Sequence, residues 1–172
     1  MTYDCFYFAY GSNMNPDRLS IRKKDAPEPP HILAIGKLIN YRPRFSRYSM
    51  MNRGGVLDII EKKGSCVYGI IYGIKRKYLH LIDKAEGAPK YYRQIKVDIL
   101  LLEVIDDDFY KSQFSNEEYL NCYCYEVVNK EPQEIPPSRT YIDHVRIGKI
   151  RYGVNIDLIE KIISRIGYEE GS

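Results

Sequence analysis

The chain has 172 residues, of which 44% are hydrophobic and 28% charged, and its formal net charge is +3. This length suits one domain with its own core, so we expect a single domain over residues 1–172. The composition excludes a disordered chain, which would have fewer apolar residues and a larger net charge. The balanced charge gives no reason to expect nucleic-acid binding, and the short basic run Arg22–Lys24 favours a solvated surface.

Neither a membrane segment nor a signal peptide is predicted. The longest apolar runs, such as Ile99–Leu102, are far below the ~18 residues needed to span a bilayer. The N-terminus lacks a basic region followed by a long apolar core. We therefore expect a cytoplasmic protein that does not bind membranes.

The chain opens with an apolar, aromatic run at residues 5–10, which predicts a buried strand. Gly11–Asn13 ends the strand, and Asn15, Pro16 and Asp17 then predict a helix with Asn15 as its N-cap. A strand that passes through such a loop into a helix presents free backbone N–H groups that suit a carboxylate. An ordinary turn explains the same residues equally well.

The next part of the chain contains several short strand patterns. A Pro-rich loop at residues 26–30 precedes weaker strand candidates at 31–41 and 44–48. A further short strand is predicted at 56–60. Residues 66–72 predict a strand more strongly, because apolar and β-favouring residues are continuous there.

The apolar spacing becomes helical at residues 75–85, and Gly87 predicts the end of this helix. Strands are predicted at 91–104 and 120–128. Between them, a charged loop is expected from residue 106 to about residue 118.

Helices dominate the last part of the chain. After a Pro-rich connection, Ser138 predicts the N-cap of a helix that Gly153 ends. A final helix, opened by Asn155 or Asp157, carries an apolar stripe that is typical of packing on a core. Strands in the middle and helices at both ends predict an α+β fold with a curved or barrel-like sheet.

The four cysteines are Cys5, Cys66, Cys122 and Cys124. Without histidine partners or a second closely spaced pair, they favour small buried side chains over a metal site. The three histidines are isolated, so no catalytic or metal-binding histidine pattern can be proposed. A site without a cofactor, run by a carboxylate, is therefore the simplest enzymatic hypothesis.

Two carboxyl groups, Asp83 and Glu86, are candidates for that role near the end of the 75–85 helix. A carboxylate at Glu86 opposes the helix dipole, whose negative end lies at the C-terminus. A partly buried Glu86 with a raised pKa would make a good general base. The pattern alone nevertheless favours a solvated surface residue.

Several segments, in order, resemble the gamma-glutamylcyclotransferase family and its wider AIG2-like relatives. They are Tyr7–Asn13, Arg53–Val56, Val67–Tyr72, Leu81–Gly87, Cys124–Tyr125 and Pro136–Tyr141. The resemblance covers nearly the whole chain. The first segment and the Glu-Gly segment are specific when taken together, although each alone would be weak.

The resemblance implies a small mixed β-barrel flanked by helices, and a cofactor-independent reaction that releases 5-oxoproline from a small γ-glutamyl compound, as in glutathione metabolism. It implies that Glu86 is the catalytic acid/base and that Tyr125 contributes a hydroxyl contact. The implied substrate-binding loop consists of Tyr7, Phe8, Ala9, Tyr10, Gly11, Ser12 and Asn13. The family also allows a homodimer.

Residues 147–155 match the family only loosely, which leaves the leaving amine open. Two other functions are also left open. A module could keep the pocket and bind a γ-glutamyl group or a carboxylate without turning it over. The interleaved basic and aromatic residues Lys90–Arg93 could bind single-stranded nucleic acid or another protein.

Overall fold

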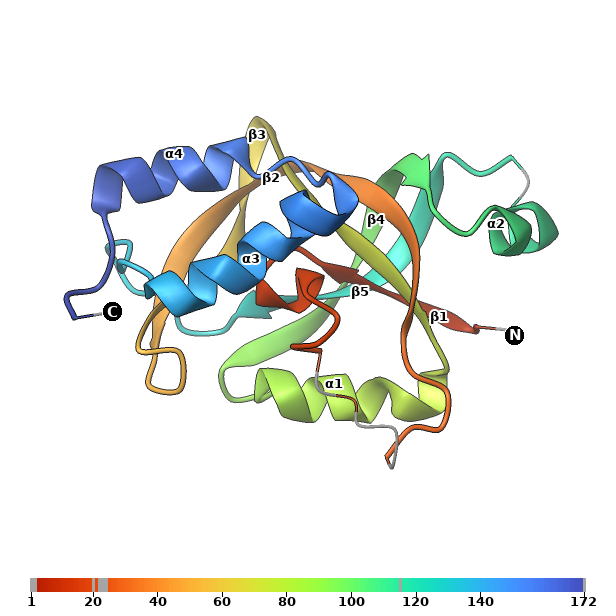
Figure 1. Ribbon diagram of the computed structural model, residues 1–172, viewed down its shortest axis with the longest axis horizontal. Coiled ribbons are helices and arrows are strands. Elements are labelled where there is room, and N and C mark those ends of the chain that lie inside the picture. The colour runs from red at the N-terminus through yellow and green to blue at the C-terminus, as the bar shows by residue number, and fades with distance from the viewer. Residues whose placement is uncertain (1–2, 20, 22–24, 115, 172) are drawn as a thin grey trace.

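The computed structural model describes residues 3–19, 21, 25–114 and 116–171. Five strands close into a barrel in the order β1-β3-β2-β4-β5, with helices packed around it (Figure 1). The strands are β1 (Cys5–Ala9), β2 (His31–Ser49), β3 (Gly54–Ile74), β4 (Tyr92–Val104) and β5 (Tyr119–Val127). This barrel confirms the expected α+β fold.

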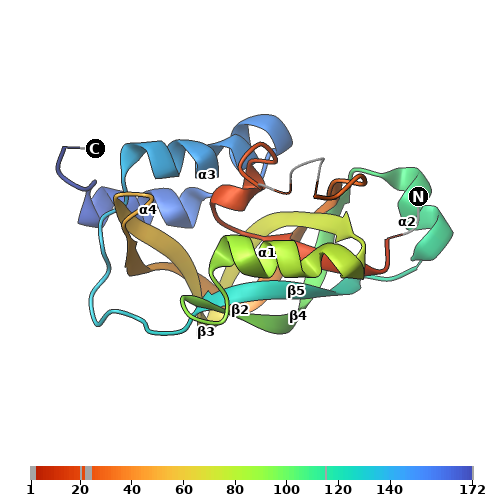
Figure 2. The same ribbon diagram turned by 90° about the horizontal axis from the view of Figure 1, so that it is seen from below.

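Two 3-10 helices and four α-helices occur in the described residues. They are η1 (Ser12–Met14), η2 (Arg76–Tyr78), α1 (Leu79–Glu86), α2 (Asp107–Gln113), α3 (Arg139–Tyr152) and α4 (Asp157–Ile166). Helices α3 and α4 lie together on one side of the barrel, α1 lies along another side, and α2 lies at the far end (Figure 1 and Figure 2). None of these helices has the length and apolar character to cross a membrane.

Strand β1 completes the barrel. It pairs antiparallel with β3 along its whole length and parallel with β5, where Tyr7 lies opposite Tyr123. The interior is filled by fully buried apolar side chains such as Phe8, Ile71 and Ile99. The N-terminal segment therefore runs through the centre of the molecule and brings the loop after it to the barrel's end.

All four segments predicted as strands between residues 31 and 72 are strand, but they form only two long strands, β2 and β3, so the predicted breaks within each pair are wrong. The pairing of these two strands contains three register shifts. At one of them Asn40 adopts a left-handed conformation with φ of 63°. A bulge of this kind breaks the alternation of side chains without ending the strand, so each long strand looks in sequence like two short ones.

The helix predicted to begin at Asn15 is also wrong. The chain instead forms η1 and then a turn, in which the Asn15 carbonyl accepts bonds from the backbone of Arg18 and Leu19. The Asn15 side-chain oxygen accepts from the Asp17 backbone N–H at 3.1 Å, and its Nδ2 contacts His144 Nδ1 at 3.0 Å. Asn15 thus stabilises a local turn rather than a helix. The basic run Arg22–Lys24 lies outside the described residues.

The charged segment after Asp106 is helical in part, so the predicted loop is wrong there. Helix α2 begins after Asp106, whose side chain accepts a bond from the Phe109 backbone N–H at 2.9 Å. Acidic residues in the first turn of α2 complement the helix dipole. A helix of seven residues with one buried aromatic, Phe109, is too short for its periodicity to stand out.

The helix that carries Glu86 follows the prediction closely. After the short turn η2, helix α1 buries Leu79 and Ile82 against the barrel. Gly87 ends it in a left-handed conformation, with φ of 65°, and donates to the Lys84 carbonyl at 3.2 Å. This confirms Gly87 as the C-terminal cap. The cap fixes Glu86 in the last turn of α1, facing the loop after β1.

Candidate active site

A cavity of about 850 Å³ opens beside the loop that follows β1. Its wall is formed by that loop, the end of α1, the β2–β3 hairpin, the start of β4, and α3. The size is in the range of small-molecule sites, about 300–1,000 Å³. Many hydroxyl and amide groups reach it, so a polar ligand suits it.

Glu86 lies in the wall of this cavity, with its two carboxylate oxygens in different surroundings. Oε1 accepts hydrogen bonds from Asn13 Nδ2 at 2.8 Å and from the Tyr7 hydroxyl at 3.2 Å. Asn13 Nδ2 also donates to the Tyr7 hydroxyl at 3.1 Å, so the three side chains form a closed set. Within the described part of the chain, no hydrogen bond to Oε2 is found. One oxygen is therefore held and the other is available to exchange a proton.

Burial raises the pKa of the Glu86 carboxyl to about 7, from an ordinary value of 4.5. Desolvation disfavours the charged form, and this effect exceeds all the others. The hydrogen bond from Tyr7, the positive charge of Arg47 and the hydrogen bond from Asn13 act in the opposite direction and hold the pKa down. A carboxyl with a pKa near neutrality can both accept and return a proton at physiological pH.

The predicted substrate-binding loop divides into two groups in the structure. Tyr7, Tyr10 and Gly11–Asn13 line the cavity. Phe8 and Ala9 do not, because their side chains are buried in the barrel core with exposures of 0% and 1%. Among the described residues, the backbone N–H groups of Gly11 and Ser12 donate to no backbone carbonyl. The backbone of this loop can therefore still accept a ligand carboxylate.

Gly11 lies at the closest approach of the loop to α3. A Cβ atom at this position would lie 3.3 Å from the Tyr141 hydroxyl and 3.6 Å from Leu57 Cβ. The Tyr141 hydroxyl accepts a bond from the Leu57 backbone N–H at 3.0 Å. The absence of a side chain at Gly11 therefore leaves room for this contact and for a ligand against the backbone.

Tyr125 lines the cavity, but its hydroxyl already forms hydrogen bonds with two other side chains. It donates to Asp83 Oδ1 at 2.6 Å and accepts from Gln94 Nε2 at 3.2 Å. Gln94 Nε2 also donates to Asp83 at 2.8 Å. Burial and the contact with Asp83 raise the pKa of Tyr125. Asp83, the other carboxyl nominated from the sequence, thus orients Tyr125 and does not line the cavity.

Many residues of the cavity wall were not predicted from the sequence, and Arg47, Tyr92 and Tyr141 are among them. Tyr92 is buried and its hydroxyl donates to the Leu57 carbonyl at 3.0 Å. Burial raises the pKa of Tyr141 to about 12, so its hydroxyl keeps its proton at neutral pH. These residues lie singly in strand and helix segments, and the residues around them in the sequence do not indicate a functional site.

The described residues include no group of three or more His, Cys, Asp or Glu side chains that could hold a metal ion. All four cysteines are free thiols, and burial raises the pKa of Cys5 to about 11. The thiols of Cys122 and Cys124 are also buried, as the sequence indicated. The polar groups of the cavity wall include the Glu86 carboxyl and several hydroxyl and amide groups.

The structure combines a closed barrel with a cavity in which a buried carboxyl of near-neutral pKa lies beside a loop whose first two backbone N–H groups donate to no described backbone carbonyl. The model of the family described as "Gamma-glutamyl cyclotransferase, AIG2-like" matches residues 7–143. The chain belongs to this family. The match begins at Tyr7, contains Glu86 and ends just after Tyr141, so it spans all the side chains around the cavity described above except His144.

Two curated relatives are named gamma-glutamylcyclotransferase. The chain is 26% identical to the protein from Bos taurus over 163 residues, which cover 92% of this chain and 77% of that protein. It is 24% identical to the protein from Homo sapiens over 161 residues, covering 91% and 76%. A solved structure named gamma-glutamyl cyclotransferase matches with a TM-score of 0.77 at 21% identity, over 98% of this chain and 90% of that one. This last likeness concerns the fold.

Proposed function

We propose that this protein is a γ-glutamyl cyclotransferase in which Glu86 is the general acid/base. The observation that carries the proposal is the state of the Glu86 carboxyl. One of its oxygens is fixed by Asn13 and Tyr7, the other has no partner among the described residues, and its pKa is about 7. Membership of the family supports the reaction class.

The reaction is an intramolecular transfer of an acyl group. The α-amine of the γ-glutamyl group attacks its own γ-carbonyl carbon, and a new C–N bond closes a five-membered lactam. The bond from that carbon to the leaving nitrogen breaks, which releases 5-oxoproline and an amine. Because attacker and target are tethered, correct positioning supplies much of the rate.

Proton transfer is the part of the reaction that requires Glu86. The attacking nitrogen enters as an ammonium group and loses two protons by the time it is a lactam N–H. The leaving nitrogen gains two protons and departs as an ammonium group, so the proton count balances without water. A single carboxyl of near-neutral pKa can carry these protons in turn from one nitrogen to the other through its free oxygen, Oε2.

The γ-glutamyl head group is assigned to the loop after β1. Its α-carboxylate suits the backbone N–H groups of Gly11 and Ser12, which donate to no other backbone group in the described chain. This places the α-amine, one carbon away, near Glu86. Tyr125 supports the same wall, and its hydroxyl is turned toward Asp83. We assign Phe8 and Ala9 an indirect role, since their side chains support the loop from the core.

The test is the Glu86→Gln variant, assayed for 5-oxoproline release from a panel of γ-glutamyl amino acids and amines. Gln keeps the size of the side chain and an oxygen that accepts from Asn13 and Tyr7, but it cannot carry a proton. We expect kcat to fall by at least about 100-fold, with KM little changed. The control is Glu103→Gln, an exposed carboxyl on β4 outside the cavity, which should keep full activity.

Full activity in the Glu86→Gln variant would remove Glu86 from the mechanism. If the wild-type protein binds γ-glutamyl compounds by calorimetry but releases no 5-oxoproline, the protein is a binding module and the proposed activity is wrong.

The site of action and the assembly of the protein are proposed from the family resemblance. We place the protein in the cytoplasm, where thiols stay reduced, and its four free cysteines support this location. A fluorescent fusion that enters an organelle would contradict it. We also propose a homodimer, which multi-angle light scattering tests directly, because a mass near the 20.2 kDa of one chain would exclude it.

A further inference from the structure

Arg47 is a positively charged residue of the cavity wall that takes no part in the proton transfers of the proposed reaction. It lies near the end of β2 and lines the same cavity as Glu86. A register shift occurs between Phe45 and Arg47, and Ser46 at the bulge is fully buried. A bulge turns the next side chain away from the direction that strict alternation would give. This brings the guanidinium to the cavity.

Two tyrosine rings hold the Arg47 guanidinium in place. Its central carbon lies 4.7 Å from the ring centroid of Tyr91 and 5.4 Å from that of Tyr92. Stacking against a ring restricts the plane of the guanidinium, while its N–H donors point outward in that plane. Arg47 is thus oriented before any ligand arrives, and its donors remain available.

The hydrogen-bonding capacity of Arg47 is mostly unused within the described residues. Nη1 donates to the neighbouring Tyr48 carbonyl at 3.2 Å. Nε is buried and has no hydrogen-bond partner among the described residues. No described carboxylate forms an ion pair with Arg47. Nη2 donates to none of the described residues, so this end of the guanidinium is the part of Arg47 that can donate to an anion in the cavity.

The second arginine of the cavity wall is used differently. Arg18 donates to the Asn52 side chain, which lies in the turn between β2 and β3. It therefore links the loop after η1 to the hairpin. Arg47 differs from Arg18, because among the described residues its guanidinium donates only to the Tyr48 backbone carbonyl.

The chemistry of the substrate places a carboxylate near Arg47. In a γ-glutamyl amino acid, the leaving nitrogen and its carboxylate are separated by one carbon atom. Glu86 must reach that nitrogen to protonate it, so the carboxylate lies within a few bond lengths of Glu86. Arg47 and Glu86 line the same cavity, and the positive charge of Arg47 acts to lower the pKa of Glu86. The other substrate carboxylate is already assigned to Gly11 and Ser12.

We propose that Arg47 binds the carboxylate of the leaving amino acid and so determines a preference for γ-glutamyl amino acids over γ-glutamyl amines. This inference rests on the proposed cyclotransferase function. It names Arg47 as a specificity-determining residue and the leaving group as an α-amino acid.

The experiment compares γ-glutamyl-L-alanine with γ-glutamyl-ethylamide, two substrates whose leaving amines differ by one carboxylate. In Arg47→Met, which keeps an apolar side chain against the tyrosines, kcat/KM for the alanine compound should fall about 10- to 100-fold, mainly through KM. The ethylamide should change by less than about threefold. Arg47→Lys keeps the charge but not the planar fork, so its loss should be selective and smaller.

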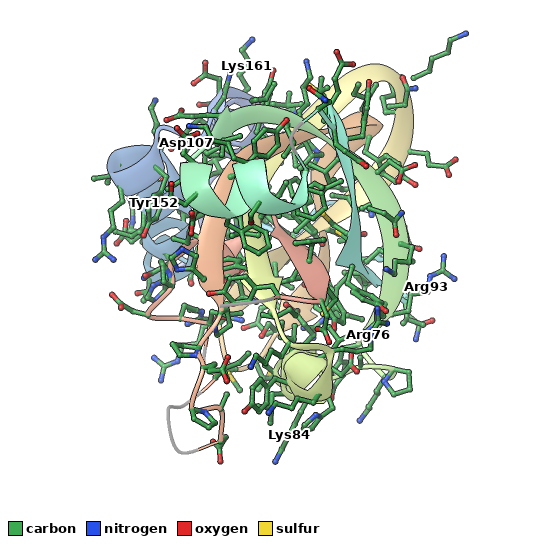
Figure 3. All side chains as sticks on the ribbon, turned by 90° about the vertical axis from the view of Figure 1, so that its right-hand side faces the viewer. Arg76, Lys84, Arg93, Asp107, Tyr152 and Lys161 are labelled. Atoms are coloured by element: carbon green, nitrogen blue, oxygen red, sulfur yellow. The ribbon has the colours of Figure 1, made fainter. Side chains whose placement is uncertain are left out.

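Arg93→Met is the matched control. Arg93 pairs with Glu126 at 2.6 Å, does not line the cavity, and extends into solvent (Figure 3). Arg93→Met removes the same charge and should leave both substrates unaffected. Thermal melting of each variant separates folding from specificity. If Arg47→Met does not fold, the role of Arg47 is tested by Arg47→Lys, whose kcat/KM should fall for the alanine compound and not for the ethylamide.

An equal loss on both substrates, or no loss on either, overturns the role of Arg47 while leaving the cyclotransferase intact. If folded wild-type protein releases 5-oxoproline from neither substrate, the proposed function itself fails and the role of Arg47 fails with it.

Discussion

At the scale of single residues, the site depends on how Glu86 is balanced between its charged and neutral forms. Burial favours the neutral carboxyl, whereas Asn13 and Tyr7 donate to one oxygen and favour the charged one. The result is a pKa of about 7. Each of these partners can be removed separately, so the balance can be tested.

Asn13→Ala removes the shorter of the two bonds to Glu86 but keeps the Asn13 carbonyl, which accepts from the Tyr72 hydroxyl at 2.8 Å. Losing a donor to the charged form raises the pKa of the carboxyl. The acidic limb of kcat/KM, expected near pH 7 in the wild type, should therefore move to higher pH in the variant.

The measurement is a kcat/KM profile from about pH 5 to pH 9. Asn121→Ala is the control, since Asn121 donates to Asp98 on the outside of the barrel and does not line the cavity. Its profile should match the wild type. An acidic limb that stays in place, or moves to lower pH, in Asn13→Ala would show that Asn13 does not stabilise the ionised carboxyl.

The sequence predicted Glu86 only through the resemblance to a family. Its partners Tyr7 and Asn13 lie 79 and 73 residues away, so no local pattern reveals that the carboxyl is buried. The same limit applies to Arg47. The direction of its side chain depends on a bulge, and its aromatic partners are Tyr91, just before β4, and Tyr92, the first residue of β4. Residue types and spacing predict elements well, but they do not predict which distant side chains meet.

At the scale of elements, Gly87 joins helix α1 to the wall of the cavity. Its φ of 65° suits glycine, and a Cβ atom there would lie 2.7 Å from the Tyr91 ring. Tyr91 in turn stacks on Arg47. The end of α1 therefore sets both the position of Glu86 and that of an aromatic partner of Arg47.

Gly87→Ala should cost about 1–2 kcal/mol of unfolding free energy from the left-handed backbone alone, and the displaced Tyr91 should also reduce activity. Gly64→Ala is the matched variant, because Gly64 has φ of 82° but open space around its Cβ position. It should lose stability to a similar degree and keep its kcat/KM. Denaturant unfolding and the 5-oxoproline assay measure the two effects. Equal activity in both variants would contradict the link between Gly87 and the site.

Elements with strong end signals were predicted correctly. Ser138 caps α3, with its side chain accepting from the Tyr141 backbone N–H at 3.2 Å, and Gly153 ends the helix with φ of 72°. Elements whose ends depend on strand pairing were predicted less well. Strands β2 and β3 continue across the bulges because each is hydrogen-bonded to the other, and the sequence of one strand alone does not contain this information.

At the scale of the whole molecule, the raised pKa of Glu86 makes stability depend on pH. The folded protein binds this proton more tightly than the unfolded chain between pH 4.5 and about 7. Stability should therefore fall as the pH rises through this range. The charged form of the Glu86 carboxyl therefore lowers the stability of the folded protein.

Glu86→Gln removes this cost. Relative to the wild type, its unfolding free energy should rise by about 2–3 kcal/mol between pH 5 and pH 8, because the pKa of Glu86 is about 7 in the folded protein and 4.5 in the unfolded chain. Urea unfolding of both proteins at the two pH values measures the difference. A gap that is the same at pH 5 and pH 8 would show that Glu86 does not titrate near neutrality in the folded protein.

The parallel pairing of β1 with β5 also constrains the order of events during synthesis. Tyr7 leaves the ribosome early, but the strand that contains Tyr123 follows more than a hundred residues later. Until then the barrel cannot close at this seam, and the cavity lacks the part of its wall that Tyr125 of β5 provides. The complete cavity therefore exists only after β5 has been synthesised.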